Sequence, residues 1–181
     1  PGRVVLAYFG AARFVGGLFA CTAKVEHEFT GATTYYGLTP RDTRRTSDNF
    51  TTQGWFTGLV PITVPIAATS FSESAWAAQQ SFDSGQKLAR VPYYRVLELA
   101  PWLDNPRPAT ELGYSNNIGI YSDGRFSYQL TIYVFLYDAG TAMSVLGPDN
   151  PIARKSIARY MAAMKSVCQQ VADGGDWGHG V

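Results

Sequence analysis

Cysteine and histidine are both scarce in this chain of 181 residues, which contains two of each. Cys21 and Cys168 are far apart and no CxxC spacing occurs, so neither a disulfide framework nor a zinc site is indicated. We expect two buried free thiols. His27 and His179 lie near opposite ends of the chain, without an HxH or HExxH pattern. The sequence therefore predicts no metal ligands.

Charge is sparse as well, since charged residues make up 16% of the chain and the formal net charge is +1. Such a balance provides no field that would gather phosphates, which argues against nucleic-acid binding through overall charge. No apolar run reaches the roughly 18 residues that a membrane span needs, and the N-terminal residues lack the charged and apolar segments of a signal peptide. We expect a soluble protein without stable membrane insertion.

The motifs of several enzyme classes are also missing. The motifs GxSxG, GxxxxGK[ST] and GxGxxG do not occur. Acidic pairs such as Glu73 with Asp83 do occur, but no other feature of the sequence supports a catalytic role for them. The sequence predicts no catalytic residue and no cofactor. We expect a protein that is not an enzyme.

Aromatic residues, at 14%, and short β-branched runs are what the chain does contain, within a hydrophobic content of 46%. These features favour one compact domain rich in strands, and an all-β class. Alternation predicts a strand over residues 13–29, with Val15, Phe19 and Cys21 on its apolar face. Residues 30–53 are polar and predict a long loop with one short strand.

Prolines place two further predicted strands at edges or bulges, because proline cannot donate to a strand ladder. Residues 59–66 form a β-branched run with Pro61 and Pro65, and residues 86–99 contain Pro92. Between them, residues 71–82 are rich in Ser and Ala. We expect a loop there with one helical turn.

A hairpin is the clearest expected feature. Residues 114–121 and 126–138 flank Ser122-Asp123-Gly124-Arg125, and Asp-Gly suits a tight turn in which both central residues need positive φ. The even positions of the second strand are apolar and predict a core face. The odd face becomes aromatic at Tyr133, Phe135 and Tyr137, so we expect another element or another subunit to cover it.

One helix is predicted near the end of the chain. Asn150 is a good N-cap, Pro151 suits the first helical position, and Gly174 closes the pattern. Its apolar stripe, which indicates core packing, consists of Ile157, Tyr160, Met161, Met164, Val167, Cys168 and Val171. The alternative is a basic amphipathic helix that disturbs a membrane.

Three segments resemble picornavirus-like coat proteins of small icosahedral RNA viruses. Val91-Pro92-Tyr93-Tyr94 is similar to the end of a strand in that family, and Leu146-Gly147-Pro148-Asp149-Asn150-Pro151 to its exit from the barrel. Arg13-Phe14-Val15-Gly16-Gly17-Leu18-Phe19 resembles its fourth strand. The run from Tyr137 to Ser144 is similar to the dicistrovirus, iflavirus and related marine groups.

The resemblance implies an eight-stranded antiparallel jelly-roll sandwich, lacking its first strands, over residues 1–151, followed by a helix and tail over residues 152–181. It implies a polyprotein product that assembles with homologous capsid subunits around packaged viral RNA, in the virion and, during assembly, in the host cytoplasm, with a host receptor as a further partner. The residues expected to pack or to form subunit interfaces are Val91, Pro92, Tyr93, Tyr94, Tyr133, Phe135 and Tyr137.

Two other functions remain as alternatives. A carbohydrate-binding jelly roll would need exposed aromatic residues on a concave face, which Trp55, Trp76 and Trp102 would provide. A cupin-like metal enzyme would need paired histidines, and the sequence lacks them.

Overall fold

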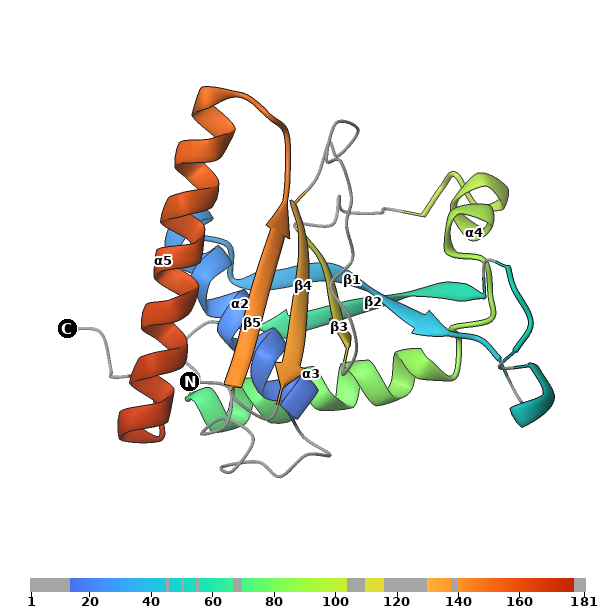
Figure 1. Ribbon diagram of the computed structural model, residues 1–181, viewed down its shortest axis with the longest axis horizontal. Helices are drawn as coiled ribbons and strands as arrows, with labels where there is room; N and C mark the ends of the chain where they lie inside the picture. The colour runs from blue at the N-terminus through green and yellow to red at the C-terminus, as the bar shows by residue number, and fades with distance from the viewer. Residues whose placement is uncertain are drawn as a thin grey trace.

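The protein has a mixed α/β fold. The computed structural model describes residues 14–44, 46–49, 51–54, 56–66, 70–103, 110–115, 130–137 and 140–177 (Figure 1). In chain order the elements are α2 (Phe14–Thr30), β1 (Thr34–Asp42), the 3-10 turn η2 (Ser47–Asn49), β2 (Thr57–Pro65), α3 (Phe71–Gln86), α4 (Tyr93–Leu99), β3 (Thr110–Ser115), β4 (Leu130–Tyr137), β5 (Gly140–Leu146) and α5 (Pro151–Gly174).

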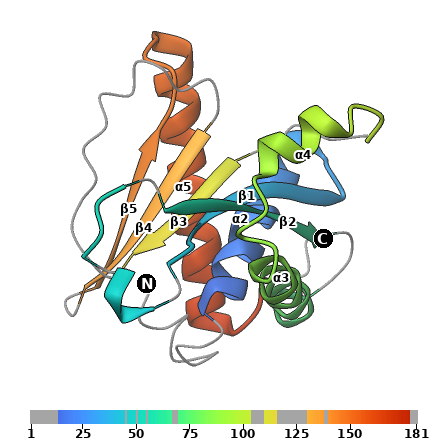
Figure 2. The same cartoon turned by 90° about the vertical axis from the view of Figure 1, so that its right-hand side faces the viewer.

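The strands form one five-stranded sheet in the order β2-β1-β3-β4-β5. The outer pairs β1–β2 and β4–β5 are antiparallel, whereas β1–β3 and β3–β4 are parallel. Helices α2, α3 and α5 pack on one face of this sheet (Figure 2), where their apolar side chains share a core with Val60, Ile62 and Val64 of β2 and Ile132 and Val134 of β4. The all-β jelly-roll prediction is therefore wrong.

Helix α2 occupies the segment for which a strand was predicted. All residues from Phe14 to Ala23 are buried, so the first half of the helix has no wet face that would reveal a helical period. The apparent alternation came from Lys24 and Glu26, which lie near the far end and are only partly buried. A segment buried on every side has no periodic signal to distinguish helix from strand.

Helix α3 replaces the predicted loop at residues 71–82. It begins at a complete capping box, in which the Ser70 hydroxyl accepts from the Glu73 N–H and the Glu73 side chain accepts from the Ser70 N–H. This S-x-x-E pattern is the local sequence signal for the start of the helix.

The predicted strand over residues 86–99 is also absent. Helix α3 ends at Gln86, and Pro92 is the N-cap of the short helix α4. Pro92 lies at the start of a helix and not in a strand, and proline is well tolerated at that position. The backbone N–H that proline lacks would have had no hydrogen-bond partner there.

The other edge prediction is confirmed, since β2, which contains Pro61 and Pro65, is one of the two edge strands of the sheet. Within the predicted hairpin, β4 is a strand, but Tyr114 and Ser115 of β3 pair with it in parallel, so the expected antiparallel pairing is wrong. The predicted turn, residues 122–125, lies outside the described residues.

The predicted C-terminal helix is confirmed as α5. The Asn150 side chain accepts from the Ala153 N–H, Pro151 occupies the first turn, and Gly175 follows the helix with φ 75°. Glycine is strongly favoured at a position after a helix where the backbone has this left-handed conformation.

Helices α2 and α3 approach closely at Gly16. Its N–H, one of the unpaired donors of the first helical turn, donates to Gln79 Oε1 at 3.0 Å. A Cβ at this position would overlap the Ala75 carbonyl oxygen and lie 2.9 Å from Gln79 Cβ. Only glycine fits between these two helices.

We predict that Gly16→Ala lowers the free energy of unfolding by about 1 to 3 kcal/mol, because the backbone of α3 must move to admit a methyl group. Urea denaturation followed by circular dichroism measures the change. The matched control is Gly174→Ala in the last turn of α5, where an added Cβ meets nothing within 4 Å. That variant should gain up to about 1 kcal/mol, and equal stability of the two variants would contradict the close helix contact.

Candidate apolar binding site

An apolar pocket lies between α2, α5 and the β4–β5 edge of the sheet. Its volume is about 120 Å³, and its lining residues are Phe14, Leu18, Cys21, Val134, Thr141, Met143, Met161, Met164, Lys165 and Cys168. The chain contains three methionines in all, and every one of them lines this pocket. Lys165 is the only charged residue among the lining residues.

The spacing of these residues follows from their elements. Phe14, Leu18 and Cys21 recur at i, i+4 and i+7 along α2, which places them on one helical face. One face of α5 likewise carries residues at helical spacing, namely Met161, Met164, Lys165 and Cys168. Two helical stripes thus form opposite walls.

The sheet supplies the third wall. Val134 and Met143 are direct cross-strand partners of β4 and β5, and Thr141 is two residues from Met143, on the same face of β5. Val134 and Met164 are buried, whereas Thr141, Met143 and Met161 are only partly buried. The pocket therefore has a closed floor and an opening beside the edge strand β5.

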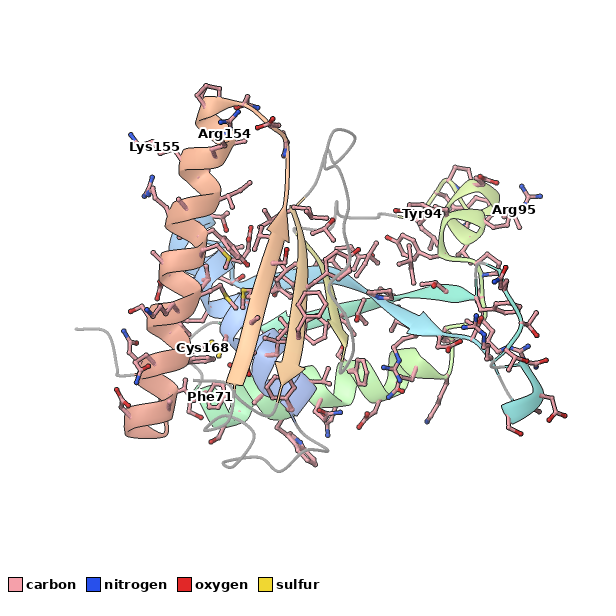
Figure 3. The ribbon with its side chains drawn as sticks, in the orientation of Figure 1. Phe71, Tyr94, Arg95, Arg154, Lys155 and Cys168 are labelled. Carbon is pink, nitrogen blue, oxygen red and sulfur yellow. The ribbon has the colours of Figure 1, made fainter. Side chains whose placement is uncertain are left out.

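The two cysteines meet across the α2–α5 contact as free thiols. The hydrogen bond from the Cys21 thiol holds the pKa of Cys168 below its ordinary value, against the effect of burial. The same hydrogen bond, together with burial, raises the pKa of Cys21. Figure 3 shows Cys168 on the inner side of α5, whereas Lys155 points away from the molecule. Because the pKa of Cys168 is lowered and that of Cys21 is raised, Cys168 is the thiol that ionises first.

Contacts on both sides of the pocket fix α5 in place. Toward its start, the Tyr160 ring packs on Phe29 of α2 with centroids 5.9 Å apart. After its end, Asp176 Oδ1 accepts from the Phe71 N–H at the first turn of α3, and the Trp177 ring meets Phe71 edge-on at 5.1 Å. Because α5 is held on both sides of the Met161–Cys168 stretch, this stretch is kept from settling into the pocket.

The residues predicted to pack or form interfaces are distributed over α4 and β4. Val91 and Tyr94 are exposed by 45% and 57%, Pro92 is exposed, and the Tyr93 hydroxyl hydrogen-bonds to that of Tyr36 at 2.8 Å. Tyr36 faces away from α2, α3 and α5, because it alternates with the core residue Tyr35. Burial and the bond to Tyr93 raise the pKa of Tyr36.

Tyr133 and Phe135 lie on that same outer face of the sheet, since they alternate with Ile132 and Val134. Their rings stack with centroids 6.4 Å apart, and Phe135 is buried. Tyr137 is the last residue of β4, and its side chain lies outside what the structure describes. None of these residues lines the pocket. Of the residues that do, Cys21, Val134, Met161, Met164 and Cys168 were expected only as core or apolar-face residues.

The part of the chain that the structure describes contains one histidine. The Nδ1–H of His27 donates to the Ala32 carbonyl oxygen at 2.7 Å, which fixes the ring beside the end of α2. Over the same residues no group of three metal-ligating side chains occurs, and no helix is long and apolar enough to cross a membrane.

Solved structures identify the class of fold. The chain superposes on a starter condensation domain of rhizomide synthetase with a TM-score of 0.75 at 14% identity, covering 97% of this chain and 44% of that one. The SgcC5 protein from Streptomyces globisporus matches with a TM-score of 0.69, also at 14% identity, covering 93% of this chain and 46% of that chain. The described fold is thus that of one part of the condensation domains.

Closer relatives are mycobacterial. The chain is 58% identical to the acyltransferase PapA3 of Mycobacterium tuberculosis over 182 residues, covering 91% of this chain and 39% of that protein. It is 48% identical to the trehalose-2-sulfate acyltransferase PapA2 of Mycobacterium bovis, covering 90% of this chain and 39% of the relative. The solved PapA2 acyl transferase matches with a TM-score of 0.82 at 46% identity, over 96% of this chain and 42% of that one. No family model matches the chain.

The chain spans about two-fifths of the length of the curated relatives it matches. These relatives overturn the capsid interpretation, together with its capsid-subunit, RNA and receptor partners and its location in a virion, because they are bacterial acyltransferases. They likewise overturn the carbohydrate-binding alternative and the expectation of a protein that is not an enzyme.

We predict that Cys168 is alkylated by iodoacetamide faster than Cys21 at pH 7.5, because the lowered pKa of Cys168 leaves more of it as the reactive thiolate. Cys21→Ala removes the hydrogen-bond donor and should slow alkylation several-fold at this pH. Cys21→Ser keeps a donor and should retain most of the rate. Peptide mass spectrometry over pH 6 to 10 gives both rates, and identical profiles for the two variants would rule out the thiol hydrogen bond.

Proposed function

We propose that this chain is part of an acyltransferase that transfers an acyl group to a hydroxyl group of a trehalose-based acceptor. The observation that carries the proposal is the identity of 58% with PapA3 and 48% with PapA2 over nine-tenths of the chain. PapA2 is a trehalose-2-sulfate acyltransferase, and PapA1 is a 2'-acyl-2-O-sulfo-trehalose (hydroxy)phthioceranyltransferase.

In such a reaction with an acyl thioester as donor, the acceptor oxygen forms a bond to the acyl carbon and the bond between that carbon and the donor sulfur breaks. The hydroxyl proton is transferred overall to the departing thiolate, which leaves as a thiol. The described residues of this chain contribute apolar surface to this process, through the pocket between α2 and α5. A long acyl chain must be kept from water during transfer, and burial of each methylene contributes about 0.8 kcal/mol.

A chimera tests this function. The 181 matching residues of the PapA2 acyltransferase are replaced by this chain, and the product is incubated with trehalose-2-sulfate and a long-chain acyl thioester. We expect mass spectrometry to detect acylated trehalose-2-sulfate at a rate within about tenfold of intact PapA2, because a substitution that preserves packing costs little. A soluble, folded chimera that forms no acylated sugar would contradict the proposal.

We also propose that the exposed apolar segment around α4 contacts the remaining part of such an acyltransferase. The occupant is inferred from length, since the curated relatives are more than twice as long as this chain. The segment contains the predicted interface residues Val91, Pro92, Tyr93 and Tyr94. Its exposed large apolar side chains are Leu88, Val91, Tyr94, Val96, Leu99, Trp102 and Leu103. Such a concentration marks an interaction surface.

Leu99→Glu should leave the melting temperature of the 181-residue chain unchanged, because Leu99 is 61% exposed there. In the chimera it should lower the melting temperature by about 2 °C or more, since a charge would enter an apolar contact. Ile152→Glu at the start of α5 is the matched control, with an exposure of 80%. Equal effects of the two substitutions in the chimera would show that α4 remains exposed.

A further inference from the structure

The pocket between α2 and α5 has the properties of a ligand site more than of a packing defect. Its floor is buried and apolar, with Val134 and Met164 exposed by 0% and 1%. Its opening, beside Thr141 and Met161, is partly exposed. A void of this kind inside a core would cost stability, because its lining loses dispersion contacts.

The contacts that flank the pocket keep it open. The Phe29–Tyr160 ring pair and the bond from the Phe71 N–H to Asp176 fix α5 on both sides of the Met161–Cys168 stretch. Collapse of α5 onto the sheet would break one of these. The empty space is therefore a consequence of the way α5 is anchored.

The lining determines what the pocket can hold. Methionine side chains are flexible and polarisable, so the three methionines can adapt to ligands of different shape. A dry apolar cavity of about 150 Å³ accepts benzene, and this pocket is slightly smaller at about 120 Å³. It has room for about four or five carbon atoms of a linear chain.

We propose that this pocket binds the terminal methyl end of an aliphatic acyl chain, which enters past β5 with its polar end outside. The inference rests on the proposed acyltransferase function and extends it, because it assigns the end of the acyl chain to the α2–α5 pocket of this chain. Among the described lining residues, Lys165 carries the one charge that an emerging polar group would meet.

The methionines supply a direct test. Protein labelled with ¹³C at the methionine methyl groups gives three signals, and all three report on the pocket. Titration of the 181-residue chain with octanoate below its micelle concentration should shift all three signals in a saturable way. Acetate at the same concentrations should shift none.

Chain length gives a second measurement. From butanoate to hexanoate the affinity should rise about tenfold, because two more methylenes are buried. Beyond the capacity of the pocket the gain per methylene should fall. An affinity that rises equally up to dodecanoate would indicate adsorption to an open surface and would overturn the proposal.

Two tryptophan substitutions localise the binding. Met161→Trp fills the partly exposed rim of the pocket and should weaken octanoate binding at least about tenfold, as reported by the Met143 and Met164 signals. Ala162→Trp places the same side chain on the exposed side of α5 and should have no effect. Unchanged melting temperatures show that both variants are folded, and equal binding by both would overturn the proposal.

These outcomes separate the inference from the function on which it rests. Formation of acylated sugar by the chimera without any octanoate shift in the chain would refute the pocket assignment and leave the acyltransferase function standing. A saturable shift with no transfer by a folded chimera would refute the function alone.

Discussion

The burial of the first half of helix α2 on every side is the constraint on which the rest of this structure depends. A helix in that position must satisfy its first backbone donors without water, and the Gly16 N–H does so through Gln79 of α3. It must also tolerate close neighbours, which explains the small residues Gly16, Gly17 and Ala20. The sheet and the helices α3 and α5 all pack against this one segment. The pocket lies where that packing is incomplete.

The elements that could be predicted are those with local signals. Asn150 and Pro151 define the start of α5, the two prolines of β2 place it at an edge, and the alternation after Leu130 identifies β4. Helix α2 gave no such signal, because the first half of its sequence lacks a polar face. Helix α3 is rich in Ser and Ala, and its capping box at Ser70 was the one cue that could have revealed it.

The candidate site could not be predicted from local patterns. Cys21, Val134 and Cys168 come together only through the tertiary fold, and Met161 and Met164 looked like ordinary core residues of α5. The family resemblance failed for a related reason. Val91-Pro92-Tyr93-Tyr94 is a four-residue pattern that fits the end of a strand and the start of a helix equally well, and here Pro92 caps α4. The placement of a domain boundary at residue 151 stays a prediction.

The contact between Asp176 and the start of α3 has a consequence for the order of events during synthesis. The Phe71 N–H and its carboxylate partner are 105 residues apart in sequence. The entropy cost of closing a loop grows only with the logarithm of its length, so a contact over this separation can form once both segments exist. Until Asp176 has emerged during synthesis, however, α3 lacks this bond at its start and α5 lacks the anchor beyond its end. The packing of α5 and α3 can therefore be completed only after the whole stretch from Phe71 to Asp176 has been made.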